Sequence, residues 1–215
     1  MFSGIVEATG EVLWANEVEQ GRLIRIGVKR PLSFDDIRTG DSIASDGVCL
    51  TVESFDSETM VFALAAETLS VTNWKAATGP ADLVGRKINL ERSLKMGDRI
   101  HGHWVTGHVD AAVQVVGVQD SAPGADPTRI LKIEIPEKLR PMVWKKGSWA
   151  VNGVSLTVNA VEGGIAEHCL IPETLARTNL GDTKPGELVN VEVDVFARAL
   201  SQSIETYLAD RMGAK

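Results

Sequence analysis

The sequence is poor in the features that mark several large classes of protein. It has only two cysteines, Cys49 and Cys169, in 215 residues, which argues against a disulfide framework and fits a reducing, cytoplasmic environment. The formal net charge is −7 and no run of lysines and arginines occurs, so we expect no binding to nucleic acid or to a membrane surface. The N-terminus lacks both a basic segment and a long apolar run, so we expect neither a signal peptide nor a transmembrane span.

Motifs for common cofactors are missing as well. The sequence has no glycine-rich dinucleotide loop, no P-loop and no serine-hydrolase elbow. His101, His103 and His108 lie close together, but strand alternation would place His108 on the opposite face from the other two, and no carboxylate or thiolate completes a ligand set. We therefore expect no metal site.

What the sequence does contain is a duplication. The segment DGVCLTV at 46–52 returns as NGVSLTV at 152–158, an offset of 106, and the Glu-Thr-Leu of 67–69 recurs at the same offset at 173–175. Residues 3–6 match 106–109 at an offset of 103, and residues 85–91 match 186–192 at an offset of 101. The first copy thus has about five extra residues, which we place in a lengthened surface loop at 74–84.

The duplication predicts two similar domains, at 1–97 and 98–195, each long enough to bury its own core. Residues 129–135 and 188–194 alternate apolar and polar side chains, and Asp46-Gly47 and Asn152-Gly153 are favoured pairs for tight hairpins. Many short strands in a small domain predict a closed barrel or a sandwich. We expect only short helices within the repeats, around 137–144 and 67–72.

The last segment, 196–215, has a different pattern. Its apolar residues recur every three or four positions, which predicts an amphipathic helix: Phe196, Leu200, Ile204, Tyr207, Leu208 and Met212. Such a helix either docks on its own barrel or meets its equivalents in other subunits, and the periodicity does not decide between the two. The fold class is therefore all-β with a C-terminal α-helix.

The repeated hairpins carry the first chemical signal. Because side chains alternate along a strand, Cys49 and Thr51 share the face opposite the aliphatic residues, and so do Ser155 and Thr157. A solvated face would explain the hydroxyls, but cysteine is rarely left on such a face. A pocket lined by short donors and acceptors, able to hold a polar heterocycle, explains the duplication better.

The copies differ at a few positions. His108 stands where the first copy has Ile5, Ser155 stands where it has Cys49, and Lys146 replaces the region of Gly40. His108 is suited to proton transfer near neutral pH and Lys146 to stabilising negative charge. The plainer alternatives are a structural histidine and a solvated lysine.

Several motifs occur together in one order: MFSGIVEATGEV at the start, both xGVxLTV hairpins, TGHVD at 106–110, KGSWAVNGVSLTV at 146–158 and LIPETLARTNL at 170–180. In this the sequence resembles the alpha-chain type of riboflavin synthase, with two lumazine-binding repeats, from Met1 to about Arg211. The resemblance implies two Greek-key β-barrels and a C-terminal helix that assembles a homotrimer. It also implies active sites between the N-terminal barrel of one subunit and the C-terminal barrel of another.

The reaction implied by the resemblance is a dismutation. Two molecules of 6,7-dimethyl-8-ribityllumazine exchange a four-carbon unit and give riboflavin and 5-amino-6-ribitylaminouracil, without metal or cofactor. Association with lumazine synthase, the enzyme that supplies the lumazine, is a further partner to consider. The alternative is a non-catalytic lumazine or flavin carrier, but a carrier needs one good pocket, whereas here the second copy keeps His108, Lys146 and Ser155.

The resemblance also assigns site residues. Those with expected catalytic roles are Phe2, Ser42, Cys49, His108, Lys146, Ser155 and Asp194. Substrate contacts in the first repeat are expected at Gly4, Ile5, Val6, Cys49, Leu50, Thr51, Ala63, Leu64, Ala65, Ala66, Glu67 and Thr68. Those in the second repeat are expected at Gly107, His108, Val109, Lys146, Ser155, Leu156, Thr157, Ile171, Pro172, Glu173, Thr174, Leu175 and Ala176.

Overall fold

The first repeat forms a closed six-stranded barrel. The computed structural model describes residues 1–18, 23–75, 78–122, 124 and 126–213. The barrel strands are β1 (Ala8–Glu17), β2 (Leu23–Lys29), β3 (Ser42–Ser45), β4 (Val48–Phe55), β5 (Thr59–Ala65) and β6 (Lys87–Arg92), in the spatial order β1-β2-β5-β4-β3-β6. Every pair of neighbours is antiparallel. Closure leaves no free sheet edge.

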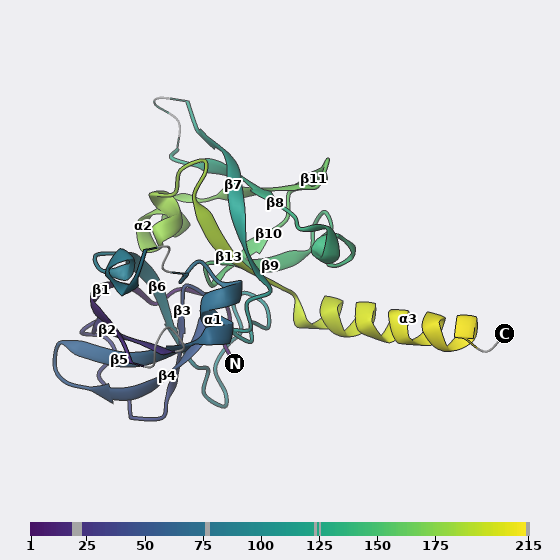
Figure 1. Cartoon of the computed structure of the whole chain (residues 1–215). Coiled ribbons are helices and arrows are strands. Elements are labelled where there is room, and N and C mark those ends of the chain that lie inside the picture. The colour runs from purple at the N-terminus through teal and green to yellow at the C-terminus, as the bar shows by residue number, and fades with distance from the viewer. Residues whose placement is uncertain (19–22, 76–77, 123, 125, 214–215) are drawn as a thin grey trace.

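The second repeat follows the same order with one interruption. Its strands are β7 (Ala111–Asp120), β8 (Arg129–Glu134), β9 (Ser148–Val151), β10 (Val154–Thr157), β11 (Ala160–Glu162), β12 (Ile165–Leu170) and β13 (Leu188–Val193), ordered β10-β9-β13-β7-β8-β12-β11. Strands β10 and β11 together occupy the place of β4. The break falls at Asn159, whose Oδ1 accepts from the Cys169 N–H at 2.9 Å. We call this sheet the second barrel; Figure 1 shows it above the first.

The predicted tight turns are confirmed. Asp46 and Gly47 have φ of 47° and 79°, and Asn152 and Gly153 have 44° and 77°. The two turns meet where the barrels touch, because a Cβ on Gly47 would lie 2.7 Å from the Gly153 nitrogen. Both positions therefore require glycine for close approach as well as for positive φ.

Each barrel has its own apolar core. The first is filled by residues such as Ile43, Phe62 and Trp74, and the second by residues such as Trp149 and Leu180. Trp74 is completely buried, and η1 (Pro80–Leu83) follows it. The expectation of a simple surface loop at 74–84 is therefore wrong at both ends of the segment, because Trp74 and Leu83 anchor it in the core; residues 76–77 lie outside the described residues.

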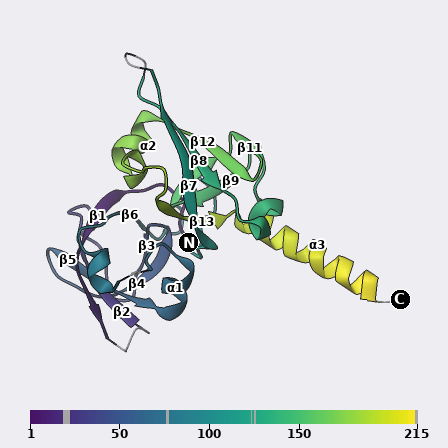
Figure 2. The same ribbon diagram turned by 45° about the horizontal axis from the view of Figure 1, so that its top comes forward.

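The predicted helices around 67–72, 137–144 and 196–212 are present, and the second repeat has two further short helices at 172–177 and 179–181. They are α1 (Ala66–Val71), η2 (Glu137–Met142), α2 (Pro172–Arg177), η3 (Asn179–Gly181) and α3 (Val195–Gly213). Beyond its first turn α3 projects away from both barrels (Figures 1 and 2), so it does not dock on its own barrel. The large apolar residues Phe196, Leu200, Ile204, Tyr207 and Leu208 are exposed along it, for instance 65% for Phe196 and 62% for Leu200. Within the described ranges, no helix has the length and apolar character needed to cross a bilayer.

Candidate functional site

The segment that opens each repeat lies on the barrel of the other repeat. The Ser155 N–H of β10 donates to the Gly4 carbonyl at 2.7 Å, and the Cys49 N–H of β4 donates to the Gly107 carbonyl at 2.9 Å. Val6 belongs to the core of the second barrel, and Val109 packs against the core of the first. The predicted contacts at 4–6 therefore join the second barrel, and those at 107–109 join the first.

Two equivalent carboxylates hold these crossed segments. Glu91 accepts from the Ser3 N–H at 2.7 Å, the Ser3 hydroxyl at 2.8 Å and the Gly4 N–H at 3.0 Å. Glu192 accepts in the same way from the N–H and hydroxyl of Thr106 and from the Gly107 N–H. Burial raises the pKa of Glu91, while the hydrogen bonds from Ser3 and Gly4 oppose that rise. Each segment is thus fixed by three directed hydrogen bonds.

The predicted polar faces are present on both barrels. Val48, Leu50 and Val52 are buried, whereas Cys49 is half-buried and Thr51 is exposed. In the second barrel Ser155 is half-buried and Thr157 is exposed, and their neighbours along the strand are buried. The strand alternation therefore works as expected.

Each face also carries a serine on the adjacent strand. Ser42 pairs directly with Thr51, and Ser148 pairs directly with Thr157. Directly opposed residues share a face, so both serines lie beside the threonines. Ser148 was missed by the sequence analysis, although the offset of 106 from Ser42 identifies it.

Some of the expected contact residues face the cores. Leu50, Leu64 and Leu156 are at most 7% exposed, and Val6 is 6% exposed. Their side chains pack inside the barrels, so only their main chains remain available to a ligand. The expected role of these residues is thereby narrowed to backbone donors and acceptors.

The window at 171–176 is shifted by two residues relative to 63–68. Helix α1 begins at Ala66 and α2 begins at Pro172, an offset of 106. The counterpart of Ala63 is therefore Cys169, which is exposed at the end of β12. Cys169 and Leu170 were missed, and the same offset was the available signal.

Ser155 has a histidine partner that the sequence analysis did not assign. The Nδ1 atom of His103 lies 2.7 Å from the Ser155 hydroxyl, and its Nε2 atom is buried without a hydrogen-bond partner. Burial lowers the pKa of His103, and the charge of Asp194 acts in the opposite direction.

Lys146 has a backbone conformation that is unusual for lysine. Its φ is 70°, and its N–H donates to the Val158 carbonyl at 2.7 Å. The equivalent residue is Gly40, with φ of 93° and its N–H on the Val52 carbonyl at 2.9 Å. Lysine thus keeps a left-handed conformation, which is unfavourable for a residue with a Cβ, where the other copy has glycine.

The remaining predicted residues have distinct surroundings. Phe2 is completely buried with Ala44, Val105 and Ala150, and Cys49 packs against this cluster. Asp194 caps helix α3 by accepting from the Phe196 N–H at 2.8 Å. His108 is exposed beside the first barrel, as its counterpart Ile5 is beside the second.

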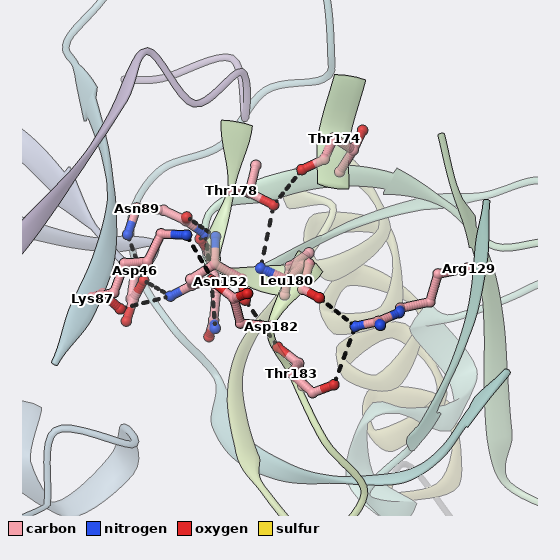
Figure 3. Close-up of polar contacts among 12 residues, drawn as sticks. Asp46, Lys87, Asn89, Arg129, Asn152, Thr174, Thr178, Leu180, Asp182 and Thr183 are labelled. Atoms are coloured by element: carbon pink, nitrogen blue, oxygen red, sulfur yellow. Dashed lines mark hydrogen bonds and ion pairs between the residues drawn. The ribbon is translucent and has the colours of Figure 1, made fainter. Parts of the chain in front are cut away.

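A polar network joins the two barrels around the paired turns, and Figure 3 shows part of it around Asp46, Asn89 and Asn152. The Asn89 amide nitrogen donates to the Asn152 carbonyl, and the equivalent Asn190 donates to the Asp46 carbonyl, each at 2.9 Å. Asp46 Oδ1 also accepts from Asn179 Nδ2 at 2.8 Å. Burial raises the pKa of Asp46 to about 6. The network fixes one barrel against the other around the paired turns.

Metal ligands do not cluster in the described part of the chain: no group of three or more histidine, cysteine, aspartate or glutamate side chains there could hold an ion. The faces instead offer hydroxyl, thiol, imidazole and main-chain groups, which can bind a neutral polar heterocycle through directed hydrogen bonds.

Comparison with known proteins agrees with this geometry. The model of the lumazine binding domain matches twice, at residues 3–93 and 106–194. Riboflavin synthase of Photobacterium phosphoreum is 37% identical over 203 residues, covering 94% of this chain and 88% of that protein. Riboflavin synthase of Brucella abortus is 38% identical over 208 residues, covering 92% and 95%. The chain belongs to the riboflavin synthase family.

A solved structure within this fold confirms the architecture. The crystal structure of LumP complexed with riboflavin superposes with a TM-score of 0.79 at 23% sequence identity, covering 90% of this chain and 99% of LumP. The expected pair of barrel-like repeats with a C-terminal helix is therefore confirmed.

Proposed function

We propose that the protein is a riboflavin synthase that converts two molecules of 6,7-dimethyl-8-ribityllumazine into riboflavin and 5-amino-6-ribitylaminouracil. One lumazine donates a four-carbon unit and the other accepts it. The observation that carries the proposal is the pair of equivalent polar faces with different polar groups, in a chain 37% and 38% identical to two riboflavin synthases over nearly its full length.

Each face combines groups from both repeats. We assign the first site to Ser42, Cys49, Thr51 and residues 63–68 of the first barrel, completed by residues 107–109. We assign the second to Ser148, Ser155, Thr157 and residues 169–176 of the second barrel, completed by residues 4–6. The hydrogen bonds to Gly4 and Gly107 support this grouping.

The two sites have different chemical equipment. His108, beside the first barrel, is the group we assign to proton transfer, because an imidazole can both accept and donate a proton and this side chain is exposed. We assign Lys146 to stabilising negative charge as the methyl group loses its proton. Phe2 lies behind Cys49 and supports it by packing. The largest contribution is expected from holding two rings face to face, worth roughly 7–11 kcal/mol.

The active enzyme is proposed to be a cytoplasmic homotrimer with sites between the first barrel of one subunit and the second barrel of another. Thr51 and Thr157 are exposed in the single chain, and so are the apolar residues of α3. The proposed units are 1–97, 98–195 and the assembly segment 196–215. Association with lumazine synthase is a further proposed contact.

Incubating the purified protein with 6,7-dimethyl-8-ribityllumazine tests the function. We expect one riboflavin for every two lumazines consumed, with many turnovers per chain, followed by absorbance and chromatography. Tight binding with altered fluorescence but no riboflavin would instead establish a carrier.

A further inference from the structure

The aspartate of the TGHVD motif has no role in the site described so far, yet it occupies a repeated structural position. Asp110 corresponds to Glu7 of the first repeat at the offset of 103. Its N–H donates to the Val191 carbonyl at 2.8 Å, as that of Glu7 does to the Leu90 carbonyl at 2.9 Å. Both carboxylates therefore lie just beyond the crossed segments.

Both carboxylates also accept a main-chain N–H from the last strand of their repeat. Glu7 accepts from the Arg92 N–H at 2.7 Å, and Asp110 accepts from the Val193 N–H at 2.9 Å. Arg92 and Val193 are themselves equivalent, at the offset of 101. The same hydrogen bond thus joins the start and the last strand of each repeat at equivalent positions.

The source of the neutralising cation differs between the repeats. In the first repeat it is the side chain of Arg92 itself, which pairs with Glu7 and with Asp36. In the second repeat, where Val193 has no charge, Arg198 supplies it from the first turn of α3, with Nη2 at 2.7 Å from Asp110 Oδ2. The arginine that neutralises the carboxylate therefore comes from the barrel in the first repeat and from helix α3 in the second.

The arginine reaches the segment that carries His108. Arg198 Nη2 also donates to the His108 carbonyl at 3.4 Å. The Nζ atom of Lys138, in η2, donates to the Asp110 carbonyl at the same distance of 3.4 Å. The Arg198 and Asp110 side chains are 32% and 18% exposed, so water shields this ion pair only in part. The first turn of α3 and the His108 segment are therefore held together by a charge-assisted hydrogen bond.

We propose that Arg198, acting through Asp110, is a positioning residue that links the orientation of helix α3 to the position of His108. Helix α3 projects from the barrels, and its large apolar residues are exposed (Figure 2). Contacts between these residues and other subunits would therefore set the orientation of α3, and with it the position of Arg198 relative to Asp110. The described part of the first repeat has no such link, because its arginine, Arg92, belongs to its own barrel. This inference rests on the proposed function for the role of His108, but not for the link itself.

Steady-state kinetics of Arg198→Gln, Arg198→Lys and Asp110→Asn test the kinetic consequence. We expect kcat to fall roughly ten- to hundredfold in Arg198→Gln while KM changes little, because misplacing one group slows chemistry more than binding. Arg198→Lys should recover much of the loss, and Lys87→Gln, which breaks the exposed Lys87–Asp182 ion pair outside α3, should behave like the unchanged protein. An unaltered kcat in Arg198→Gln would overturn the proposal.

The double variant Arg198→Gln/Asp110→Asn separates positioning from assembly. If the two residues act as a pair, its loss equals that of either single variant; losses that multiply would overturn the pairing. Asp110 does not belong to α3, so Asp110→Asn should lower kcat even though sedimentation shows an unchanged oligomer.

The imidazole signals provide a readout that does not need turnover. The chain has four histidines, so each can be followed by nuclear magnetic resonance with labelled histidine. The His108 signal should shift in Arg198→Gln and Asp110→Asn, while that of the buried His168 stays in place. A stationary His108 signal contradicts the link. If the unchanged protein forms no riboflavin, the proposed function fails, but this measurement still decides the inference.

Discussion

The two repeats share a main-chain framework but fill it with different buried side chains. Ile43 and Phe62 occupy the first core, and the equivalent positions of the second hold Trp149 and His168. The Trp149 indole N–H donates to His168 Nε2 at 2.8 Å, and His168 Nδ1 lies 2.8 Å from the Thr157 carbonyl. The second core thus has a hydrogen-bonded polar pair where the first has an apolar pair. This polar pair contacts β10, the strand that carries Ser155 and Thr157 of the second site.

The paired turns show the same divergence. Asp46 of the first repeat lies opposite Asn152 of the second, and both are buried. Asn152 Oδ1 accepts from the Asn190 N–H, and Asp46 Oδ1 accepts from the equivalent Asn89 N–H, each at 2.8 Å. The two repeats therefore share the same hydrogen-bond geometry at this turn. They differ in that Asp46 can gain or lose a proton, whereas the amide of Asn152 cannot.

Replacing His108, the exposed residue of one crossed segment, should have the largest effect on turnover. We expect His108→Ala to lower turnover roughly a hundredfold and to weaken lumazine binding much less, because general acid-base groups contribute on this scale. Ile5→Ala, the matched change in the other repeat, should weaken lumazine binding but lower turnover far less, because Ile5 is assigned only to contact the substrate. Steady-state kinetics beside a fluorescence titration measure both; equal losses in the two variants would remove the special role of His108.

The buried Asp46 should lower stability at neutral pH. The pKa of Asp46 is about 6 in the folded protein, against 3.8 for the ordinary side chain. The folded state therefore holds the proton longer, and stability decreases as pH rises from about 4 to about 6. Asp46→Asn should raise the free energy of unfolding by about 3 kcal/mol at pH 7.5 and hardly at all near pH 4.

Urea denaturation at both pH values measures this, with Asn152→Asp as the matched opposite change, which should destabilise. A gain for Asp46→Asn that is the same at both pH values would contradict the explanation by protonation.

The polar pair of the second core should give the opposite pH dependence. Burial lowers the pKa of His168 to about 4 from 6.5. The unfolded chain therefore takes up the proton first, and stability is lost as pH falls from about 6.5 to about 4, by about 3 kcal/mol. The variant Trp149→Ile/His168→Phe, which copies the first core, should lose this dependence, although the smaller isoleucine in place of Trp149 lowers stability overall. Denaturation midpoints across this pH range would reveal a persisting slope, which would contradict the assignment.

Relieving the strained lysine should have the smallest effect on stability. Lys146→Gly copies Gly40 and should stabilise the fold by about 0.5–1 kcal/mol, because the left-handed strain outweighs the extra freedom of glycine in the unfolded chain. Turnover should fall at the same time. Thermal denaturation and kinetics of this variant, beside Gly40→Lys, test whether the strain serves the reaction; a gain in stability with full turnover would show that it does not.

Much of the fold could be predicted from the sequence because the repeat shows the same strand and turn patterns twice. The Asp-Gly and Asn-Gly turns, the alternation around Cys49 and Ser155, and the periodicity of α3 each depend on neighbouring residues. The crossing of residues 4–6 and 107–109 could not be predicted. It depends on main-chain bonds between Gly4 and Ser155 and between Gly107 and Cys49, and such bonds leave no side-chain pattern.

The site was only partly predictable for a related reason. His103, Ser148 and Cys169 have their significance from neighbours far away in the sequence, and only the offset of 106 pointed to Ser148 and Cys169. The interpretation of 74–84 as a loop missed the burial of Trp74, because burial depends on the space available in the core and not on the local sequence.

The central claim is that the reaction needs one working site of each kind, contributed by different subunits. Thr51→Arg and Thr157→Arg are matched changes that block the first and the second face at exposed positions. Each variant alone is predicted to form almost no riboflavin, and refolding the two together is predicted to restore turnover in mixed oligomers. Full turnover by either variant alone, or a mixture as inactive as its components, would contradict the account.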